Sequence, residues 1–174
     1  MIYRPFVPAD KAAVIAVLGA SYDGWHGSYN EVFWDWKFLG NPHGPARIWV
    51  ADEGGQIAGC YILTPVMLRG AGGPIRGAQA VDAAVSPDYR GRGLFTDLAR
   101  AALRDAVNAG IRLISAFPSE GAFGGQIRVG FKPQLVLPKA YRPLLWPPRR
   151  RRFSELALGE VKAVSYTHLT LPTI

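Results

Sequence analysis

The alternation of apolar and polar residues divides the chain into strands and helices of ordinary length. The clearest helical pattern covers residues 93–109, where apolar residues recur at intervals of three and one and form one stripe. Gly110 follows at the position of a left-handed C-cap. Apolar and β-branched runs predict strands, and clusters of Gly, Pro and Asn predict the turns between them. The predicted strands cover residues 2–7, 46–52, 56–68, 75–85, 111–117 and 131–142.

Three further helices complete the predicted order. The first begins after Pro8, and the other two cover residues 30–39 and 121–129. The order is one strand, two helices, three antiparallel strands, and then helix, strand, helix, strand. We therefore expect an α/β fold with a mixed, mostly antiparallel sheet and helices on both faces. The expected domain covers residues 1–143.

Aromatic residues gather in the predicted helix at 30–39 and just before it, at Trp25 and Tyr29. A wall for a substrate cleft is one interpretation of this group. Val32, Trp36 and Leu39 follow helical spacing, which favours ordinary core packing for that face. Trp34 and Phe38 fall on another face of the helix and are the better cleft candidates.

Composition supports a folded domain and limits its expected partners. Hydrophobic residues make up 49% of the chain and charged residues 19%, as in globular proteins. No apolar run approaches the roughly 18 residues of a membrane helix, and no secretory signal is visible. We therefore expect a cytoplasmic protein with no membrane partner. The single cysteine, Cys60, lies mid-strand and indicates a core residue rather than a nucleophile.

No metal is expected, because His26 and His43 lack partners at ligand spacing. The net charge of +7 is local, since four positive charges lie in the run Arg149–Arg152 and the remaining 16 basic residues face 13 acidic ones. This distribution does not favour a nucleic-acid-binding face over the whole domain. A solvated linker is the leading interpretation of the run, and docking to RNA, phospholipid or an acidic partner is the alternative.

The chain after residue 143 departs from the domain pattern. Residues 144–163 indicate a basic linker or the start of a further region. Residues 164–174 resemble the translation of adapter DNA from sequencing libraries, so we expect a non-native tail there. The native protein is then expected to continue beyond about residue 163.

The segment from Val81 to Thr96 carries the most chemical information. A predicted strand ends at Val85, a turn follows, and Arg-Gly-Arg-Gly at 90–93 leads directly into the strongest helix. Glycines let the backbone approach an anion, and the free N–H groups and positive end of a helix attract it. The glycine spacing excludes a Walker A loop and a dinucleotide fingerprint. The pattern favours a pyrophosphate-binding turn, with an ordinary glycine turn as the alternative.

This segment resembles the coenzyme-binding motif of the GNAT superfamily of N-acetyltransferases, Arg/Gln-x-x-Gly-x-Gly/Ala. Arg90 and Gly93 match its first two marks, and Phe95 stands where a small residue is usual. The resemblance covers roughly residues 1–140 and is closest in the segments FWDWKFLGNPHGP and AVDAAVSPDYRGRG, in the neighbourhood of the enhanced-intracellular-survival acetyltransferases. It implies a GNAT-like fold and direct transfer of an acetyl group from acetyl-CoA, as co-substrate, to a small-molecule or peptide amine.

The resemblance also implies where acetyl-CoA binds. The coenzyme lies in a gap between the strand ending at Val85 and the strand ending at Phe117, and the N–H of Val85 polarises the thioester carbonyl. The implied contacts are Ala83, Ala84, Val85, Arg90, Gly91, Arg92, Gly93, Leu94, Phe95, Thr96, Phe117 and Ser119.

The general acid and base are open at this point. The family acid is often a tyrosine five residues before the aromatic of a Gly-Phe pair; Gly130-Phe131 places Gln126 there, which does not titrate. Three alternatives remain for the group that protonates the leaving thiolate. It is water, a tyrosine from elsewhere in the chain, or a residue found by a different register of the motif. The candidate bases are Asp82 and Glu120, each acting through water. An ion-paired strand residue is the structural alternative for Asp82, and a helix-start acid is that for Glu120.

Two other function classes are compatible with the residues. One is a catalytically weak acyl-CoA-binding or regulatory module, which the missing tyrosine and Phe95 favour. The other is nucleic-acid binding through Arg90, Arg92 and the arginine run. Neither the acceptor nor the oligomeric state is indicated by the sequence.

Overall fold

The computed structural model describes residues 1–22, 30–137 and 163–166. The arginine run, most of the predicted linker and the last eight residues lie outside the described residues. So do His26 and two of the aromatic residues, Trp25 and Tyr29.

One five-stranded sheet forms the centre of the domain, with strand order β1-β2-β3-β4-β5. Neighbouring strands are antiparallel, except that β5 runs parallel to β4. A separate antiparallel pair joins β6 to β7, whose residues overlap the start of the predicted non-native tail. The strands are β1 (Ile2–Pro5), β2 (Arg47–Glu53), β3 (Gln56–Gly70), β4 (Gly73–Val85), β5 (Leu113–Ala116), β6 (Pro133–Leu137) and β7 (Ala163–Tyr166).

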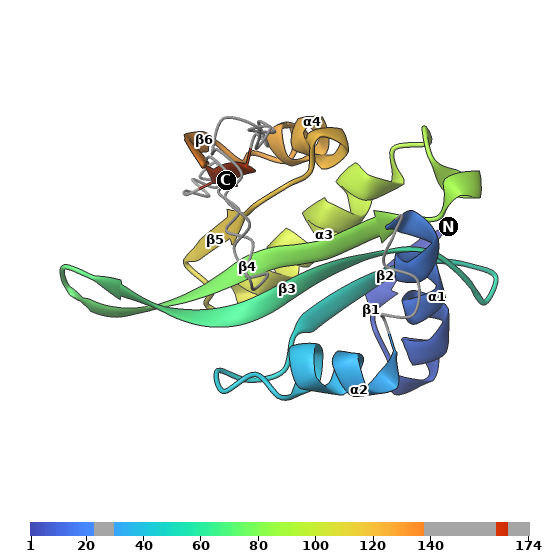
Figure 1. Ribbon diagram of the computed structural model, residues 1–174, viewed down its shortest axis with the longest axis horizontal. Coiled ribbons are helices and arrows are strands. Elements are labelled where there is room, and N and C mark those ends of the chain that lie inside the picture. Colours follow the sequence, from blue (N-terminus) through green and yellow to red (C-terminus); the bar gives the residue numbers. More distant parts are fainter. Residues whose placement is uncertain (23–29, 138–162, 167–174) are drawn as a thin grey trace, which may run out of the picture.

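Helices cover both faces of the sheet, as expected. Figure 1 shows α1 and α2 on one side of it and α3 and α4 on the other. No helix in the described ranges combines the length and apolar character needed to cross a membrane. The helices are η1 (Pro8–Asp10), α1 (Lys11–Ser21), α2 (Glu31–Trp34), the π-helical turn η2 (Asp35–Leu39), η3 (Pro87–Tyr89), α3 (Leu94–Asn108) and α4 (Glu120–Arg128).

Two apolar cores lie on opposite faces of the sheet. On one face, the apolar stripe of α3, including Leu98 and Ala102, packs on Tyr61 and Leu63 of β3. On the other face, Val14 and other residues of α1 pack with the helical segment 31–39 and with the alternate residues of β3. This arrangement follows from the period of two along a strand, which sends successive side chains to opposite faces.

The expected burial of the segment 31–39 is wrong, because the opposite face is the buried one. Trp34 and Phe38 are 1% and 0% exposed and lie in the second core, where Trp34 also contacts Phe6 at 5.4 Å between ring centroids. Val32, Trp36 and Leu39 are exposed. Both faces of this helix carry apolar residues, so helical spacing alone could not decide which of them meets the sheet.

The buried position of Trp34 and the exposed position of Trp36 predict that replacing each by alanine changes stability to very different extents. Trp34→Ala should lower the free energy of unfolding by about 3–5 kcal/mol, because it removes a large buried side chain and leaves a cavity. Trp36 is 71% exposed, so Trp36→Ala should change stability by about 0.5 kcal/mol or less. Urea unfolding of both variants measures the difference, and similar losses in the two would contradict this assignment of the core.

Candidate functional site

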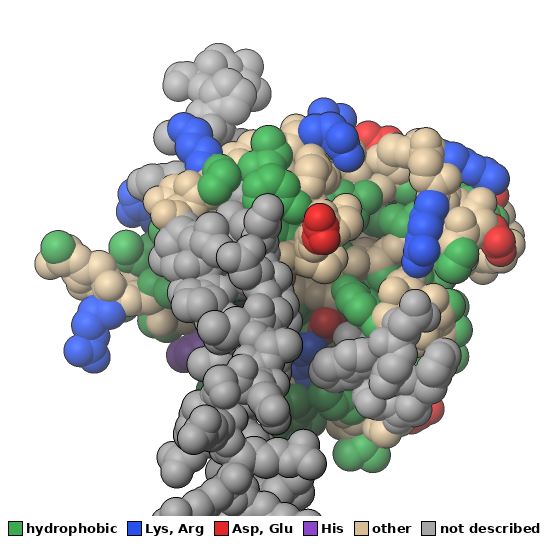
Figure 2. All heavy atoms as spheres, turned by 45° about the horizontal axis from the view of Figure 1, so that its top comes forward, with side chains coloured by type: hydrophobic (Ala, Val, Ile, Leu, Met, Phe, Trp, Pro, Cys, Tyr) green, Lys and Arg blue, Asp and Glu red, His purple; other side chains and the backbone are tan. Residues whose placement is uncertain are grey.

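A groove opens where β4 and β5 stop pairing. The parallel ladder joins only Gly77–Ala80 to Leu113–Ala116. Beyond it, β4 continues to Val85 while the chain after Ala116 leads into α4. The two segments border a groove of about 1410 Å³, whose floor and walls come from the end of β4, the start of α3 and the segment 116–128. Figure 2 shows this hollow with apolar side chains around it and charged side chains in it.

A bulge in β4 forms one edge of the groove. Cys60 pairs with Ala84 and Ile62 with Val81, so Asp82 and Ala83 together face the single residue Tyr61. Asp82 has a φ of 46°, the only positive value among the described non-glycine residues. Bulges of this kind bend a strand, re-aim its side chains and are common beside active sites.

The backbone at the end of β4 directs polar groups into the groove. The N–H of Ser86 donates to the carbonyl of Ala58 on β3 at 2.9 Å. Because successive N–H groups along an extended strand point to opposite sides, the N–H of Val85 is directed away from β3, toward the opening. The carbonyl of Val85 lies on the same side and accepts from Ser21 Oγ at 3.4 Å and Arg90 Nε at 3.3 Å.

The glycine turn before α3 has the backbone expected for anion binding. Gly91 and Gly93 have φ values of 77° and 81°. Residues other than glycine rarely adopt this backbone conformation. The N–H of Thr96 closes the first helical turn on the carbonyl of Gly93 at 3.0 Å. Within the described chain, the N–H groups of residues 91–95 have no backbone acceptor. Five residues of the turn and helix start line the groove directly after Arg90, namely Gly91, Gly93, Leu94, Phe95 and Thr96.

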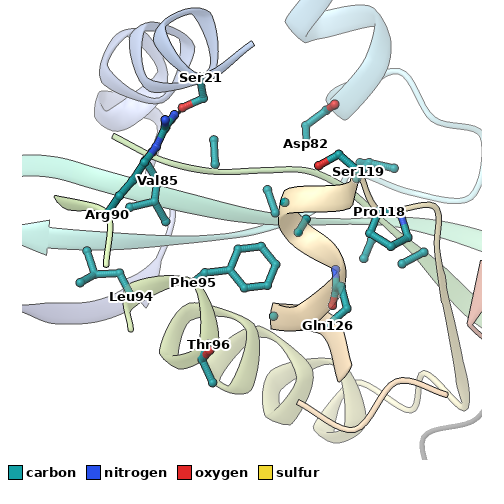
Figure 3. A pocket seen from close by; sticks show the side chains of 18 of the residues that line it. Ser21, Asp82, Val85, Arg90, Leu94, Phe95, Thr96, Pro118, Ser119 and Gln126 are labelled. Atoms are coloured by element: carbon teal, nitrogen blue, oxygen red, sulfur yellow. Dashed lines mark hydrogen bonds between the residues drawn. The ribbon is translucent and has the colours of Figure 1, made fainter. Parts of the chain in front are cut away.

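The two arginines of the turn are placed differently. Arg90 lines the groove, and Figure 3 shows its side chain extended toward Ser21 of α1. The side chain of Arg92 donates to the carbonyl of Asp88 at 3.0 Å and lies 5.2 Å from the ring centroid of Tyr89. Arg92 does not line the groove. The expected contact of its side chain with a coenzyme is therefore not supported, because that side chain packs on the outside of the turn.

Phe95, the departure from the family motif, has a matching space on α4. Its ring lies so close to Gly125 that a Cβ added there would stand 2.5 Å from two ring carbons. The ring also meets Tyr61 edge-on, with centroids 5.8 Å apart and planes at 72°. The bulky residue is accommodated because α4 has a glycine opposite it.

The two candidate bases both line the groove, in different settings. Asp82, with a side chain 14% exposed, forms an ion pair with Lys37 of η2. Lys37 is held over the rings of Phe33 and Phe38, at 5.2 and 5.5 Å from their centroids. Glu120 is exposed at the first residue of α4. The structural alternative for Asp82, an ion-paired strand residue, is thus compatible with a position inside the groove.

A buried tyrosine–glutamine pair lies on the α4 side. Gln126 is 4% exposed and lines the groove, and its Oε1 accepts from the hydroxyl of Tyr61 at 2.9 Å. Burial raises the pKa of Tyr61, so its hydroxyl is neutral and acts as the donor. A tyrosine of β3 thus contacts Gln126, the position at which the family acid is expected.

Of the other predicted residues, Ala83, Ala84, Phe117 and Ser119 line the groove. Cys60 is buried, and burial raises the pKa of its thiol to about 12, which agrees with a core role. Across the described residues, no cluster of three or more His, Cys, Asp or Glu side chains could hold a metal ion.

Sequence reasoning missed several groove residues, among them Ser21, Tyr22 and Lys37. The hydroxyl of Tyr22 donates to the carbonyl of Ala83 at 3.2 Å, and burial together with the charge of Asp82 raises the pKa of Tyr22. No local pattern marks these residues. The one available signal was a lone lysine inside the aromatic segment 33–38.

Several solved structures share this fold. A GCN5-related N-acetyltransferase from Anabaena variabilis matches with a TM-score of 0.64 at 17% identity, over 76% of this chain and 32% of that one. A ribosomal-protein-alanine N-acetyltransferase from Brucella melitensis matches with a TM-score of 0.68 at 15% identity, over 97% and 99% of the two chains. A GNAT family acetyltransferase from Brucella melitensis, solved in complex with acetyl-CoA, matches with a TM-score of 0.59 at 24% identity, over 75% and 82%.

The chain spans about a third of the length of the Anabaena protein. A comparison with curated protein sequences gave no match. The family described as acetyltransferase (GNAT) domain matches residues 3–132. Since that match covers most of the chain and includes the bulged strand, the glycine turn and α4, this chain belongs to the GNAT acetyltransferase family.

Proposed function

We propose that this domain transfers an acetyl group from acetyl-CoA directly to the amine of a small molecule or peptide. The observation that carries the proposal is the groove between β4 and β5, because it joins an open strand edge to an anion-binding turn. The similar Brucella acetyltransferase was solved with acetyl-CoA, and acetyl-CoA is the co-substrate that the family implies.

The proposed binding mode uses backbone groups more than side chains. The diphosphate would accept from the free N–H groups of residues 91–95, where the helix dipole also favours negative charge. The pantetheine amides would pair with the open edge at Ala83–Val85, as an added strand would. Arg90 contributes positive charge at the end of this edge.

The proposed chemistry places the acetyl carbonyl at the end of β4. The N–H of Val85 would stabilise the negative charge that develops on the carbonyl oxygen. A neutral amine forms the new C–N bond as the C–S bond breaks, and the electron pair of that bond leaves on sulfur. The amine proton passes through water to Asp82, which its ion pair with Lys37 holds within the groove. Holding both reactants in one groove supplies much of the rate gain.

A binding or regulatory module without turnover is the second candidate. Gln126, in place of a titrating acid, is the observation that favours it.

The acceptor is part of the proposal only as a class, an amine. A reducing cytoplasm suits the single, buried Cys60, which is a free thiol.

The glycine turn gives a direct test of coenzyme binding. Acetyl-CoA should raise the melting temperature of the protein, and Gly93→Asp should abolish the rise, because it adds a side chain and a negative charge at the proposed diphosphate site. Gly54→Asp is the matched control, since Gly54 also has a positive φ, of 63°, and lies in the β2–β3 turn outside the groove. Scanning fluorimetry measures both. An equal acetyl-CoA response in wild type and Gly93→Asp would contradict the binding mode.

Turnover is tested by thiol release from acetyl-CoA with a panel of amines: a polyamine, an aminoglycoside, free amino acids and lysine peptides. For an accepted amine, Asp82→Asn should lower kcat/KM by about 100-fold, within the range for loss of a general base. Asp35→Asn is the control, because Asp35 pairs with Lys11 outside the groove. A larger loss of kcat/KM in Glu120→Gln than in Asp82→Asn would indicate that Glu120 is the general base. Acetyl-CoA binding with no thiol release from any amine would favour the regulatory module.

A further inference from the structure

Gln126 is an unusual side chain in this domain. Among the described residues, and apart from tyrosine and cysteine, only Asp10 and Gln126 are polar or charged and buried. Asp10 is fully engaged, accepting from two nitrogens of Arg4 and from the N–H of Val7 at 2.7–2.9 Å. Gln126 has one hydrogen bond, through its oxygen. The two buried polar side chains therefore differ in how well they are satisfied.

The unsatisfied part of Gln126 is a donor. Its Oε1 accepts from Tyr61, which leaves the two N–H groups of Nε2. Within the described residues, no acceptor contacts that nitrogen. Nε2 is not fully enclosed by protein. Because Gln126 lines the groove, this donor is available to a molecule bound there. Figure 3 shows Gln126 on α4, across the groove from β4.

The orientation of the amide is fixed by its surroundings. Tyr61 is 0% exposed, so its hydroxyl has no water to exchange with, and burial raises its pKa so that it keeps its proton. The ring of Phe95 packs edge-on against Tyr61 and occupies the space left by Gly125. The hydroxyl of Tyr61 donates to Oε1 of Gln126, and this bond leaves Nε2 on the remaining, groove side.

We propose that Gln126 donates a hydrogen bond to the thioester sulfur of bound acetyl-CoA and to the thiolate that leaves, and that Tyr61 is the residue that positions it. This inference rests on the proposed function. The electron pair of the broken C–S bond stays on sulfur, where the amide N–H stabilises it, and the amine proton goes to Asp82 and solvent. The departing thiolate then takes its proton from water.

The chemistry of the leaving group permits an amide in this role. An unperturbed thiol has a pKa of about 8.5, so a thiolate is a moderate base near neutral pH and needs stabilisation more than immediate protonation. Glu120, on the same helix, is an acceptor when ionised and cannot donate to sulfur. A fixed, water-excluded donor is the kind of group that stabilises developing charge well.

The first test observes the hydrogen bond without turnover. In ¹⁵N-labelled protein, the side-chain NH₂ signals of Gln126 are assigned by their loss in Gln126→Leu. Saturating acetyl-CoA should shift both signals in wild type, and Tyr61→Phe should broaden or double them because the amide is no longer fixed. Backbone shifts at residues 91–95 report binding separately. Backbone shifts with unmoved Gln126 signals would overturn this inference and leave the proposed function standing; no shifts at all would overturn both.

The second test uses turnover with an amine accepted by wild type. Gln126→Leu should lower kcat by about 100-fold, comparable to loss of one oxyanion donor, with little change in the KM for acetyl-CoA. Tyr61→Phe should lower kcat by about 10-fold, and the double variant should be no worse than Gln126→Leu, since residues that act as a unit are not additive. Losses confined to thermal stability, with kcat unchanged, would show a purely structural pair.

The pH profile separates donation from packing. In Gln126→Glu the buried carboxyl has a raised pKa, so it can donate below that pKa and not above it. Its kcat should therefore fall as pH rises, on a limb that wild type lacks. Gln56→Leu is the matched control, because Gln56 also accepts from a tyrosine, Tyr89, at 3.3 Å, but at an exposed position outside the groove. A Gln126→Glu profile parallel to that of wild type would overturn the proposal.

Discussion

The early end of the ladder between β4 and β5 is the constraint on which the site depends. The backbone groups of the two strands pair through hydrogen bonds only as far as Ala80 and Ala116. Beyond that point β4 has an open edge inside the domain rather than at its surface. Buried polar backbone is costly when unpaired, so an internal open edge is stable only if solvent, a ligand or nearby side chains satisfy it. The groove is the consequence of this interruption, and its shape follows the divergence of the two strands.

The bulge at Asp82 determines which groups the open edge presents. One extra residue opposite Tyr61 resets the alternation of the strand, so the backbone of Val85 faces the opening and the side chain of Asp82 reaches the groove. Residues from the other face of the sheet then stabilise the edge: Ser21 and Tyr22, at the end of α1, donate to carbonyls of β4. The two cores hold these elements from opposite sides, which makes the edge a rigid support for chemistry.

Two departures from the family pattern are connected through packing. Phe95 replaces a small residue at the start of α3, and Gln126 stands where a titrating acid is usual. In the structure the ring of Phe95 contacts both Gly125 and Tyr61, and the hydroxyl of Tyr61 donates a hydrogen bond to Gln126. A large ring on α3, a glycine on α4 and a buried tyrosine on β3 thus form one unit. The substitution that looks unfavourable in isolation helps to fix the polar group beside it.

The sequence by itself determined the order of elements, the fold class and the turn at residues 90–93. Hydrophobic period and glycine placement act over a few residues, so they can be interpreted without knowing the rest of the chain. Only the tertiary structure decided that Trp34 rather than Trp36 is buried, that Lys37 pairs with Asp82, and that Tyr61 meets Gln126. Each of these outcomes depends on how a helix docks on the sheet and joins residues distant in the chain, and no local pattern encodes that docking.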